Sequence, residues 1–393
     1  MPTNKTAKGL HRSAIALAAT LLLNSPGFPS GPQRPSSETG SFTVFDAPGA
    51  GSEAGQGTIP WSINANGEIT GNFVDAMGVP HGFLRNKSGS FVVFDAPNAS
   101  LRPEQGTIAR AINQQGDIAG YFYAVNGVRR GFLRRKDGSF IVFDPLGSAG
   151  TVINAINALD QVAGNYVVND QAHGLLGRKD GTFVTFDPPG GFNTAPEWIN
   201  DTGEIAGYYE DEVGMLHGFI RHKDGTFTTV DVPGAVAGEG KGTFPMGLNE
   251  SGSMIGHYSA GANSLDRGFI RQKDGTFANL DPPGGITDDA AHADAEGYVL
   301  RAVTAPLGIN RLGEIAGYFD DTSGFVHGFV RHADATFMVF EVPGASKGSG
   351  LGTFPASIND SGEVTGYFYT GAIGVQHGFL LTPPSSRPPA LRK

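Results

Sequence analysis

Short apolar runs alternate with polar turn residues along almost the whole chain. Each repeat of roughly 45 residues holds four runs rich in β-branched and aromatic residues, separated by Gly, Asn, Asp and Pro. In one copy we expect strands at Thr107–Asn113, Asp117–Phe122, Arg130–Arg134 and Ser139–Asp144. The period of an amphipathic helix is absent from the repeats, so the pattern predicts an all-β fold.

The repeat occurs seven times, and each copy keeps a threonine six residues before an asparagine. These pairs are Thr58/Asn64, Thr107/Asn113, Thr151/Asn157, Thr194/Asn200, Thr243/Asn249, Thr304/Asn310 and Thr353/Asn359. Four strands in a repeat of this length are typical of a propeller blade. We therefore expect a seven-bladed β-propeller over residues 41–382, with four antiparallel strands per blade.

The copy boundaries do not coincide with the ends of the chain. The first recognisable strand, Ser41–Asp46, corresponds to a fourth strand, and the last recognisable set is a first, second and third strand ending at His377–Leu381. We expect the N-terminal strand to pair in the last blade, a 1+3 closure that leaves no open sheet edge between the two ends.

The turn between the third and fourth strands fixes their register. It has three residues, as in Lys136 to Gly138, and its last residue needs a positive φ, so Ala335 in the sixth copy predicts a strained turn. The same register places a basic residue opposite a carboxylate in every blade. The pairs are His81/Asp95, Arg130/Asp144, His173/Asp187, His217/Asp231, Arg267/Asp281, His327/Glu341 and, across the closure, His377/Asp46.

We interpret these pairs as hydrogen bonds that join strand ends; sites for metals or acid/base chemistry are the alternative, because His and Asp serve both. A second recurring spacing predicts cross-strand ion pairs of small energetic value. Its members are Glu68/Arg85, Asp117/Arg134, Glu204/Arg221 and Glu314/Arg331.

The amino-acid composition argues against some classes of ligand and of stabilising bond. The formal net charge is −10 and the isoelectric point is near 5.4, which disfavours nucleic acid because its binding depends on clustered Lys and Arg. Cysteine is absent, so disulfides and thiolate metal sites are excluded.

The N-terminus carries basic residues and then an apolar run, Ala14–Leu23, that is too short to span a bilayer. We read residues 1–25 as a signal peptide, with an uncleaved anchor or a disordered leader as the alternative. Residues 26–40 are expected to form a disordered linker and residues 383–393 a disordered tail. The protein is therefore expected to be secreted, periplasmic or on the cell surface, with no membrane span in the mature chain.

Equivalent positions of the seven repeats either keep one residue type or vary. The positions that vary are the better candidates for binding a specific ligand, because the repeated ones report the architecture. The most varied position of the first strand lies between the recurring Thr and Asn, and reads Trp61, Arg110, Asn154, Glu197, Met246, Leu307, Ala356. We expect Trp61, Arg110, Glu197 and the neighbouring Trp198 to line the mouth of a central channel and bind a ligand. The alternative is that this column tolerates any residue.

One copy carries an insertion, Ile286–Val303, that is rich in acidic residues. Asp288, Asp289, His292 and Asp294 are candidate ligands of a divalent cation, because oxygen-rich clusters suit Ca²⁺ or Mg²⁺. An exposed acidic loop is the alternative reading, and no other cofactor is expected.

The motifs Ile-Asn-x-x-Gly-x-Ile-x-Gly-Tyr, His-Gly-Phe-x-Arg and Phe-x-x-Phe-Asp-x-Pro-Gly resemble those of the HAF repeat family of bacterial extracellular proteins. The resemblance covers residues 41–381 and implies an exported protein, but it brings no catalytic residues.

Two functions are open. One is an extracellular binding or scaffold propeller, expected to be monomeric, that recognises a carbohydrate or protein through one rim. The other is a secreted polysaccharide lyase or glycoside hydrolase with its site at the channel mouth.

Overall fold

The computed structural model describes residues 40–260, 265–287, 303–371 and 374–384. The expected signal peptide, all but Gly40 of the expected linker and residues 385–393 of the expected tail lie outside these ranges. Within the ranges the chain forms 28 strands and no helix. A helix long and apolar enough to cross a membrane is accordingly not found there.

The strands follow one another in antiparallel groups of four, which we call units. Unit 1 comprises β2 (Gly57–Ile63), β3 (Ile69–Val74), β4 (Pro80–Arg85) and β5 (Phe91–Phe94). Unit 2 comprises β6 (Thr107–Ile112), β7 (Ile118–Tyr123), β8 (Arg129–Arg134) and β9 (Phe140–Phe143). Unit 3 comprises β10 (Gly150–Ile156), β11 (Val162–Val168), β12 (Gln171–Gly177) and β13 (Phe183–Phe186).

Units 4 to 6 repeat this arrangement. Unit 4 comprises β14 (Phe192–Ile199), β15 (Ile205–Glu210), β16 (Leu216–Arg221) and β17 (Phe227–Val230). Unit 5 comprises β18 (Thr243–Leu248), β19 (Met254–Ser259), β20 (Asp266–Arg271) and β21 (Phe277–Leu280). Unit 6 comprises β22 (Thr304–Ile309), β23 (Ile315–Asp320), β24 (Val326–Arg331) and β25 (Phe337–Phe340).

Unit 7, the last, is built from both ends of the described chain. Strands β26 (Thr353–Ile358), β27 (Val364–Thr370) and β28 (Val375–Thr382) are joined by β1 (Ser41–Phe45), which pairs antiparallel with β28. Phe42 lies opposite Leu381, so the pairing expected from the sequence is present. A single parallel bridge from Gly57 to Gln376 connects this unit to unit 1.

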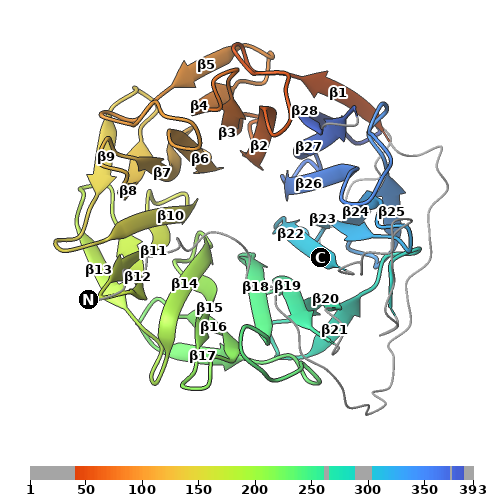
Figure 1. Ribbon diagram of the computed structural model, residues 1–393. Coiled ribbons are helices and arrows are strands. Elements are labelled where there is room, and N and C mark those ends of the chain that lie inside the picture. The colour runs from red at the N-terminus through yellow and green to blue at the C-terminus, as the bar shows by residue number, and fades with distance from the viewer. Residues whose placement is uncertain (1–39, 261–264, 288–302, 372–373, 385–393) are drawn as a thin grey trace, which may run out of the picture.

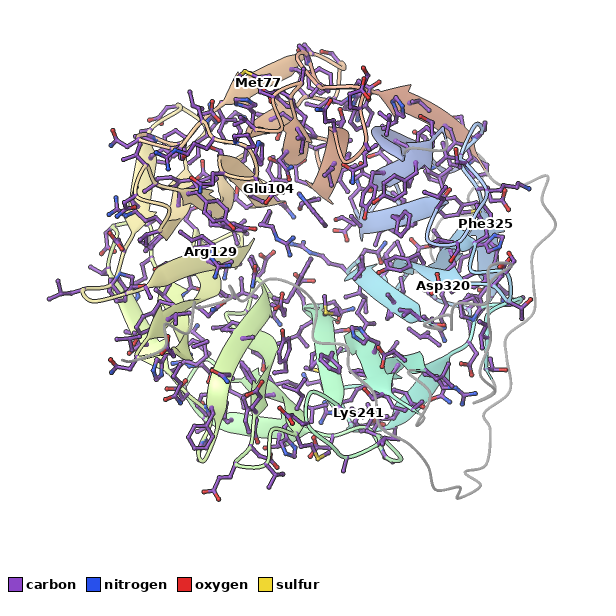
Figure 2. The ribbon with its side chains drawn as sticks, viewed as in Figure 1. Met77, Glu104, Arg129, Lys241, Asp320 and Phe325 are labelled. Atoms are coloured by element: carbon purple, nitrogen blue, oxygen red, sulfur yellow. The ribbon has the colours of Figure 1, made fainter. Side chains whose placement is uncertain are left out.

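The units are arranged around a common centre, and the first strand of each lies nearest to it (Figure 1). Side chains from neighbouring units fill the space between the sheets (Figure 2). One such cluster combines Phe94 of unit 1 with Phe122 and Phe132 of unit 2. The third strands are apolar on both faces, as Phe132 and Leu133 show with no solvent exposure. Burial between units therefore supplies most of the hydrophobic stabilisation.

A recurring glycine of the second strand allows the first two strands to approach closely. A Cβ atom at Gly71 would come within 2.2 Å of the carbonyl oxygen of Ile59, and one at Gly120 within 2.1 Å of that of Ile108. Any side chain at these positions would collide with backbone, which explains why every copy keeps the glycine.

The recurring asparagines form a belt of hydrogen bonds around the centre. The side-chain Nδ2 of each asparagine donates to the backbone carbonyl oxygen of the equivalent asparagine in the next unit, at 2.9 to 3.3 Å. Asn359 donates to Asn64, so the series returns to its first member. Each Oδ1 accepts backbone N–H groups of its own turn, for example those of Asn66 and Glu68 on Asn64.

The basic and acidic residues of the third and fourth strands pair as the register predicts. The contacts are His81–Asp95 at 2.9 Å, Arg130–Asp144 at 2.9 Å, His173–Asp187 at 2.7 Å, His217–Asp231 at 2.9 Å, His327–Glu341 at 3.2 Å and His377–Asp46 at 2.9 Å. In unit 5 the guanidinium of Arg267 donates instead to the carbonyl oxygen of Thr287. These pairs join strand ends, as a structural role requires.

The predicted ion pairs between the second and third strands, such as Glu68/Arg85, are wrong. Arg85 lies opposite Ile69, one residue away from Glu68, so the two charges project from opposite faces of the sheet. Three of the four arginines instead cover aromatic rings of the preceding unit, with 4.7 Å from Arg85 to Phe45, 4.6 Å from Arg134 to Phe94 and 4.9 Å from Arg221 to Phe186. Cation–π contact between packed sheets replaces the expected salt bridge.

The strained turn predicted for the sixth copy is confirmed. Ala335 has a φ of +68°, in the left-handed region where Gly275 of unit 5 has +90°. The backbone keeps the conformation of the other copies, and the alanine bears the strain.

Candidate functional site

The varied position of the first strand recurs once in each unit, and we call its seven residues the inner column. They are Trp61 on β2, Arg110 on β6, Asn154 on β10, Glu197 on β14, Met246 on β18, Leu307 on β22 and Ala356 on β26. All lie on the strands nearest the centre of the ring (Figure 1). Units 1 to 4 thus contribute aromatic or polar groups, and units 5 to 7 contribute aliphatic ones.

Arg110 and Trp61 are in direct contact. The guanidinium carbon of Arg110 lies 4.6 Å from the centroid of the Trp61 ring. The indole Nε1 of Trp61 donates to Oδ1 of Asn72 at 2.8 Å, and its ring meets the edge of Tyr367 at a centroid distance of 6.3 Å. The hydrogen bond and the ring contact fix the indole, so the guanidinium over it has a defined place.

Glu197 is a half-buried carboxyl with an unusual protonation equilibrium. Burial raises the pKa of Glu197 to about 7, and the positive charge of Arg110 opposes part of this shift. Burial raises the pKa of the Tyr208 phenol on β15, and the nearby charge of Glu197 raises it further. A carboxyl with a pKa near neutrality is a frequent property of functional sites.

Neither charge is neutralised by a hydrogen bond or an ion pair within the described ranges of the chain. Asn154, which lies between them in the column, is committed to structure because its Nδ2 donates to the carbonyl oxygen of Pro196 at 3.0 Å. This bond connects β10 to the residue that precedes Glu197. Arg110 and Glu197 are thus positioned groups with free hydrogen-bonding capacity.

Aromatic rings of units 6 and 7 continue the wall beyond Trp61. Phe354 stacks on Tyr367 with a centroid distance of 5.0 Å and an interplanar angle of 4°, and it also contacts Tyr318 at 5.1 Å and Tyr369 at 5.5 Å. These rings are half-buried. They give the inner surface a face suited to apolar parts of a ligand.

Trp198 does not join the other three predicted residues. It packs against the cluster of unit 5 that contains Leu248 and Met254. It also lines a cavity of about 140 Å³ among the turns that join the first and second strands. The structure therefore brings together Trp61, Arg110 and Glu197, and places Trp198 at the end of the ring where these turns lie.

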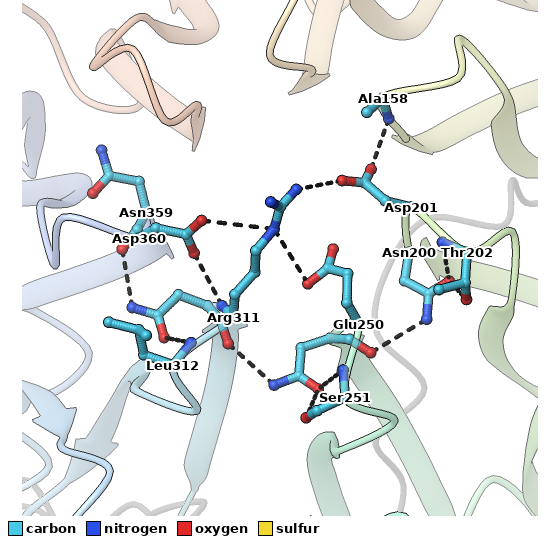
Figure 3. A network of polar contacts seen from close by, with 12 residues as sticks. Ala158, Asn200, Asp201, Thr202, Glu250, Ser251, Arg311, Leu312, Asn359 and Asp360 are labelled. Atoms are coloured by element: carbon cyan, nitrogen blue, oxygen red, sulfur yellow. Dashed lines mark hydrogen bonds and ion pairs between the residues drawn. The ribbon is translucent and has the colours of Figure 1, made fainter. Parts of the chain in front are cut away.

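That cavity contains a polar network that the sequence did not suggest (Figure 3). Arg311 of unit 6 lies 2.6 Å from Asp201 of unit 4, and 3.6 Å from both Glu250 and Asp360. The four residues each follow a belt asparagine. In the sequence this position reads Ala65, Gln114, Ala158, Asp201, Glu250, Arg311 and Asp360, and its variation was the available signal.

The proposed cation ligands Asp288, Asp289, His292 and Asp294 lie outside the described residues. Among the residues that are described, no group of three or more His, Cys, Asp or Glu side chains could hold a metal ion.

No protein-family model and no curated protein matches the sequence. Among solved structures, a streptogramin B lyase superposes with a TM-score of 0.51 at 16% identity, covering 86% of this chain and 97% of its own. Virginiamycin B lyase from Staphylococcus aureus gives 0.50 at 13% identity, over 87% of this chain and 99% of that one. A prolyl endopeptidase gives 0.53 at 12% identity, over 82% of this chain and 46% of that one. At such identities the likeness speaks to fold alone, and the fold of this chain is a β-propeller.

Proposed function

We propose that this chain is a secreted binding propeller that recognises a carbohydrate or protein ligand through one rim of a closed, seven-bladed ring. The pairing of β1 with β28 and the return of the asparagine belt from Asn359 to Asn64 support closure and the number of blades. The basic and apolar N-terminus and the resemblance to the HAF repeat family support export.

The observation that supports a binding role is that repeated and non-repeated polar residues differ in their contacts. The repeated polar residues are committed to structure: the asparagines to the belt, and the His/Asp pairs to strand ends. Arg110 and Glu197, which do not repeat, have hydrogen-bonding groups that no described residue engages, and they lie beside an aromatic wall. Groups that a fold does not need for its own stability are available for a ligand.

The ligand enters from the rim formed by the longer loops. At the other end of the ring, Arg311 reaches across the centre from unit 6 to Asp201 of unit 4 and obstructs entry (Figure 3). The loops at the open rim include Tyr123 and Tyr369 at strand ends, whose rings can contact a larger ligand.

A secreted lyase or glycoside hydrolase is the second candidate, and the protonation of Glu197 favours it. With a pKa of about 7, this carboxyl can act as an acid or a base near neutral pH. The virginiamycin B lyase structure, which matches over almost its full length, is by its name an enzyme, so a propeller of this size can carry an active site.

The experiment compares ligand capture by the wild-type chain with capture by Arg110→Met and Glu197→Gln. Glycan and peptide arrays are probed with each, and retained polysaccharides are assayed for reducing ends and unsaturated uronates. Arg102→Met and Glu53→Gln are the matched controls, because both residues are exposed on loops. Capture that both site variants lose supports the proposal; product release supports the enzyme; capture that survives both variants contradicts a site at Arg110 and Glu197.

A further inference from the structure

The inner column has a polar half and an apolar half. Arg110, Asn154 and Glu197 come from three successive units, whereas Met246, Leu307 and Ala356 come from the next three. Met246 and Leu307 are half-buried at the inner surface. A ligand that fills the centre of the ring therefore meets charged groups on one side and aliphatic groups on the other.

Arg110 is built to receive a planar anion. Its guanidinium is held over the fixed Trp61 ring at 4.6 Å, and its N–H groups make no hydrogen bond among the described residues. A stacked guanidinium presents its N–H edges as a fork that matches a carboxylate.

Glu197 offers the complementary charge two units further along the ring. Its carboxylate accepts no hydrogen bond from the described part of the chain, although the charge of Arg110 reaches it. The two groups do not form an ion pair among the described residues, so each keeps hydrogen-bonding capacity for a ligand. One positive and one negative group give a site with no net charge, which favours a ligand with both charges over a polyanion.

We propose that the inner column binds a small zwitterion that carries a carboxylate, an ammonium group and an apolar side chain, namely a free amino acid or a short peptide. The carboxylate pairs with Arg110, the ammonium group with Glu197, and the side chain packs on Met246 and Leu307. This rests on the proposed function and specifies its ligand.

The test is calorimetric titration of the full chain with four probes: leucine, leucyl-leucine, N-acetyl-leucine, which lacks the ammonium group, and leucinamide, which lacks the carboxylate. We expect leucine or leucyl-leucine to bind at least about tenfold more tightly than either blocked form. In Arg110→Met, leucine and leucinamide should bind equally; in Glu197→Gln, leucine and N-acetyl-leucine should bind equally. The methionine keeps an apolar contact with Trp61, and circular dichroism checks that each variant is folded.

Three results would overturn the inference. One is the absence of binding by leucine and leucyl-leucine to folded wild-type protein. Another is binding that is indifferent to both blocked probes or to both variants. The last is binding of cellobiose or glucuronic acid, titrated in the same way, that depends on Arg110 when no zwitterion binds. This result would leave the proposed binding function standing and replace the ligand class.

Discussion

Arg110 covers the Trp61 ring at 4.6 Å, and this contact joins the first strands of two successive units. The chain has two tryptophans, so Trp198→Phe leaves Trp61 as the sole indole reporter. In that background Arg110→Ala should uncover the ring, which shifts its emission to longer wavelength and increases quenching by acrylamide. Arg102→Ala in the same background should change neither property, and an unchanged spectrum in the Arg110 variant would contradict the contact.

Glu197 should make folding pH-dependent in an unusual direction. The pKa of Glu197 is about 7 in the folded chain against 4.5 for an ordinary glutamate. The free energy of unfolding therefore decreases as the pH rises from 4.5 to about 7. Glu197→Gln removes the cost of burying a charge on β14. We expect the variant to be more stable than wild type by about 1–3 kcal/mol at about pH 8, and nearly equal at about pH 4.

Urea unfolding at both pH values measures this difference. Glu53→Gln is the matched control, because Glu53 is exposed on a loop. Equal stability of Glu197→Gln and wild type at the higher pH would mean that the carboxyl is not buried.

The asparagine belt should be a principal source of stability. Asn249→Ala removes the hydrogen bond to the carbonyl oxygen of Asn310 at 3.1 Å and leaves the N–H groups of Ser251 and Ser253 without their acceptor. Unsatisfied buried groups cost about 1–3 kcal/mol each, so we expect a loss of about 2–4 kcal/mol in unfolding free energy. Asn66→Ala, which removes an exposed hydrogen bond to Gln114, should cost less than about 1 kcal/mol. Similar losses for the two variants would refute the belt.

The strained turn at Ala335 should be improvable. A left-handed conformation costs a residue with a Cβ atom about 1–2 kcal/mol, and the greater freedom of glycine in the unfolded chain returns part of this. Ala335→Gly should therefore stabilise the chain by about 0.5–1 kcal/mol. Gly275→Ala, at the equivalent turn with a φ of +90°, should destabilise it by a similar amount. Chemical denaturation of the pair tests both signs, and a destabilised Ala335→Gly would show that strain is not the dominant effect.

The features that were predicted correctly from the sequence are those that depend on short spacings along the chain. The turn length fixed the partners of His81 and its equivalents, because strand register follows from the turn. The belt was not predicted, because the carbonyl oxygen that each asparagine side chain binds lies one repeat away in the sequence. The partner of Arg85 was wrong for the same reason: Phe45 belongs to another unit.

The site follows the same rule. Variation along one column identified Trp61, Arg110 and Glu197, and the ring places them together. Trp198 was included as a sequence neighbour, but the pairing of β14 with β15 is irregular between Pro196 and Trp198, and Trp198 packs into the cluster of unit 5. The network around Arg311 was overlooked because its residues lie in turns, where variation is common.

The ring must close for the inner column to surround one site, and an engineered disulfide tests closure most directly. The chain has no cysteine, and Thr43 lies opposite Leu380 in the pairing of β1 with β28. Thr43→Cys/Leu380→Cys should oxidise within one chain and raise the unfolding free energy by about 4–5 kcal/mol, because the bond closes almost the entire chain into a loop. Val44→Cys/Leu380→Cys should remain reduced, since Val44 projects to the other face. Free thiols in the first pair, or equal oxidation of the two pairs, would contradict the closed ring and the site built on it.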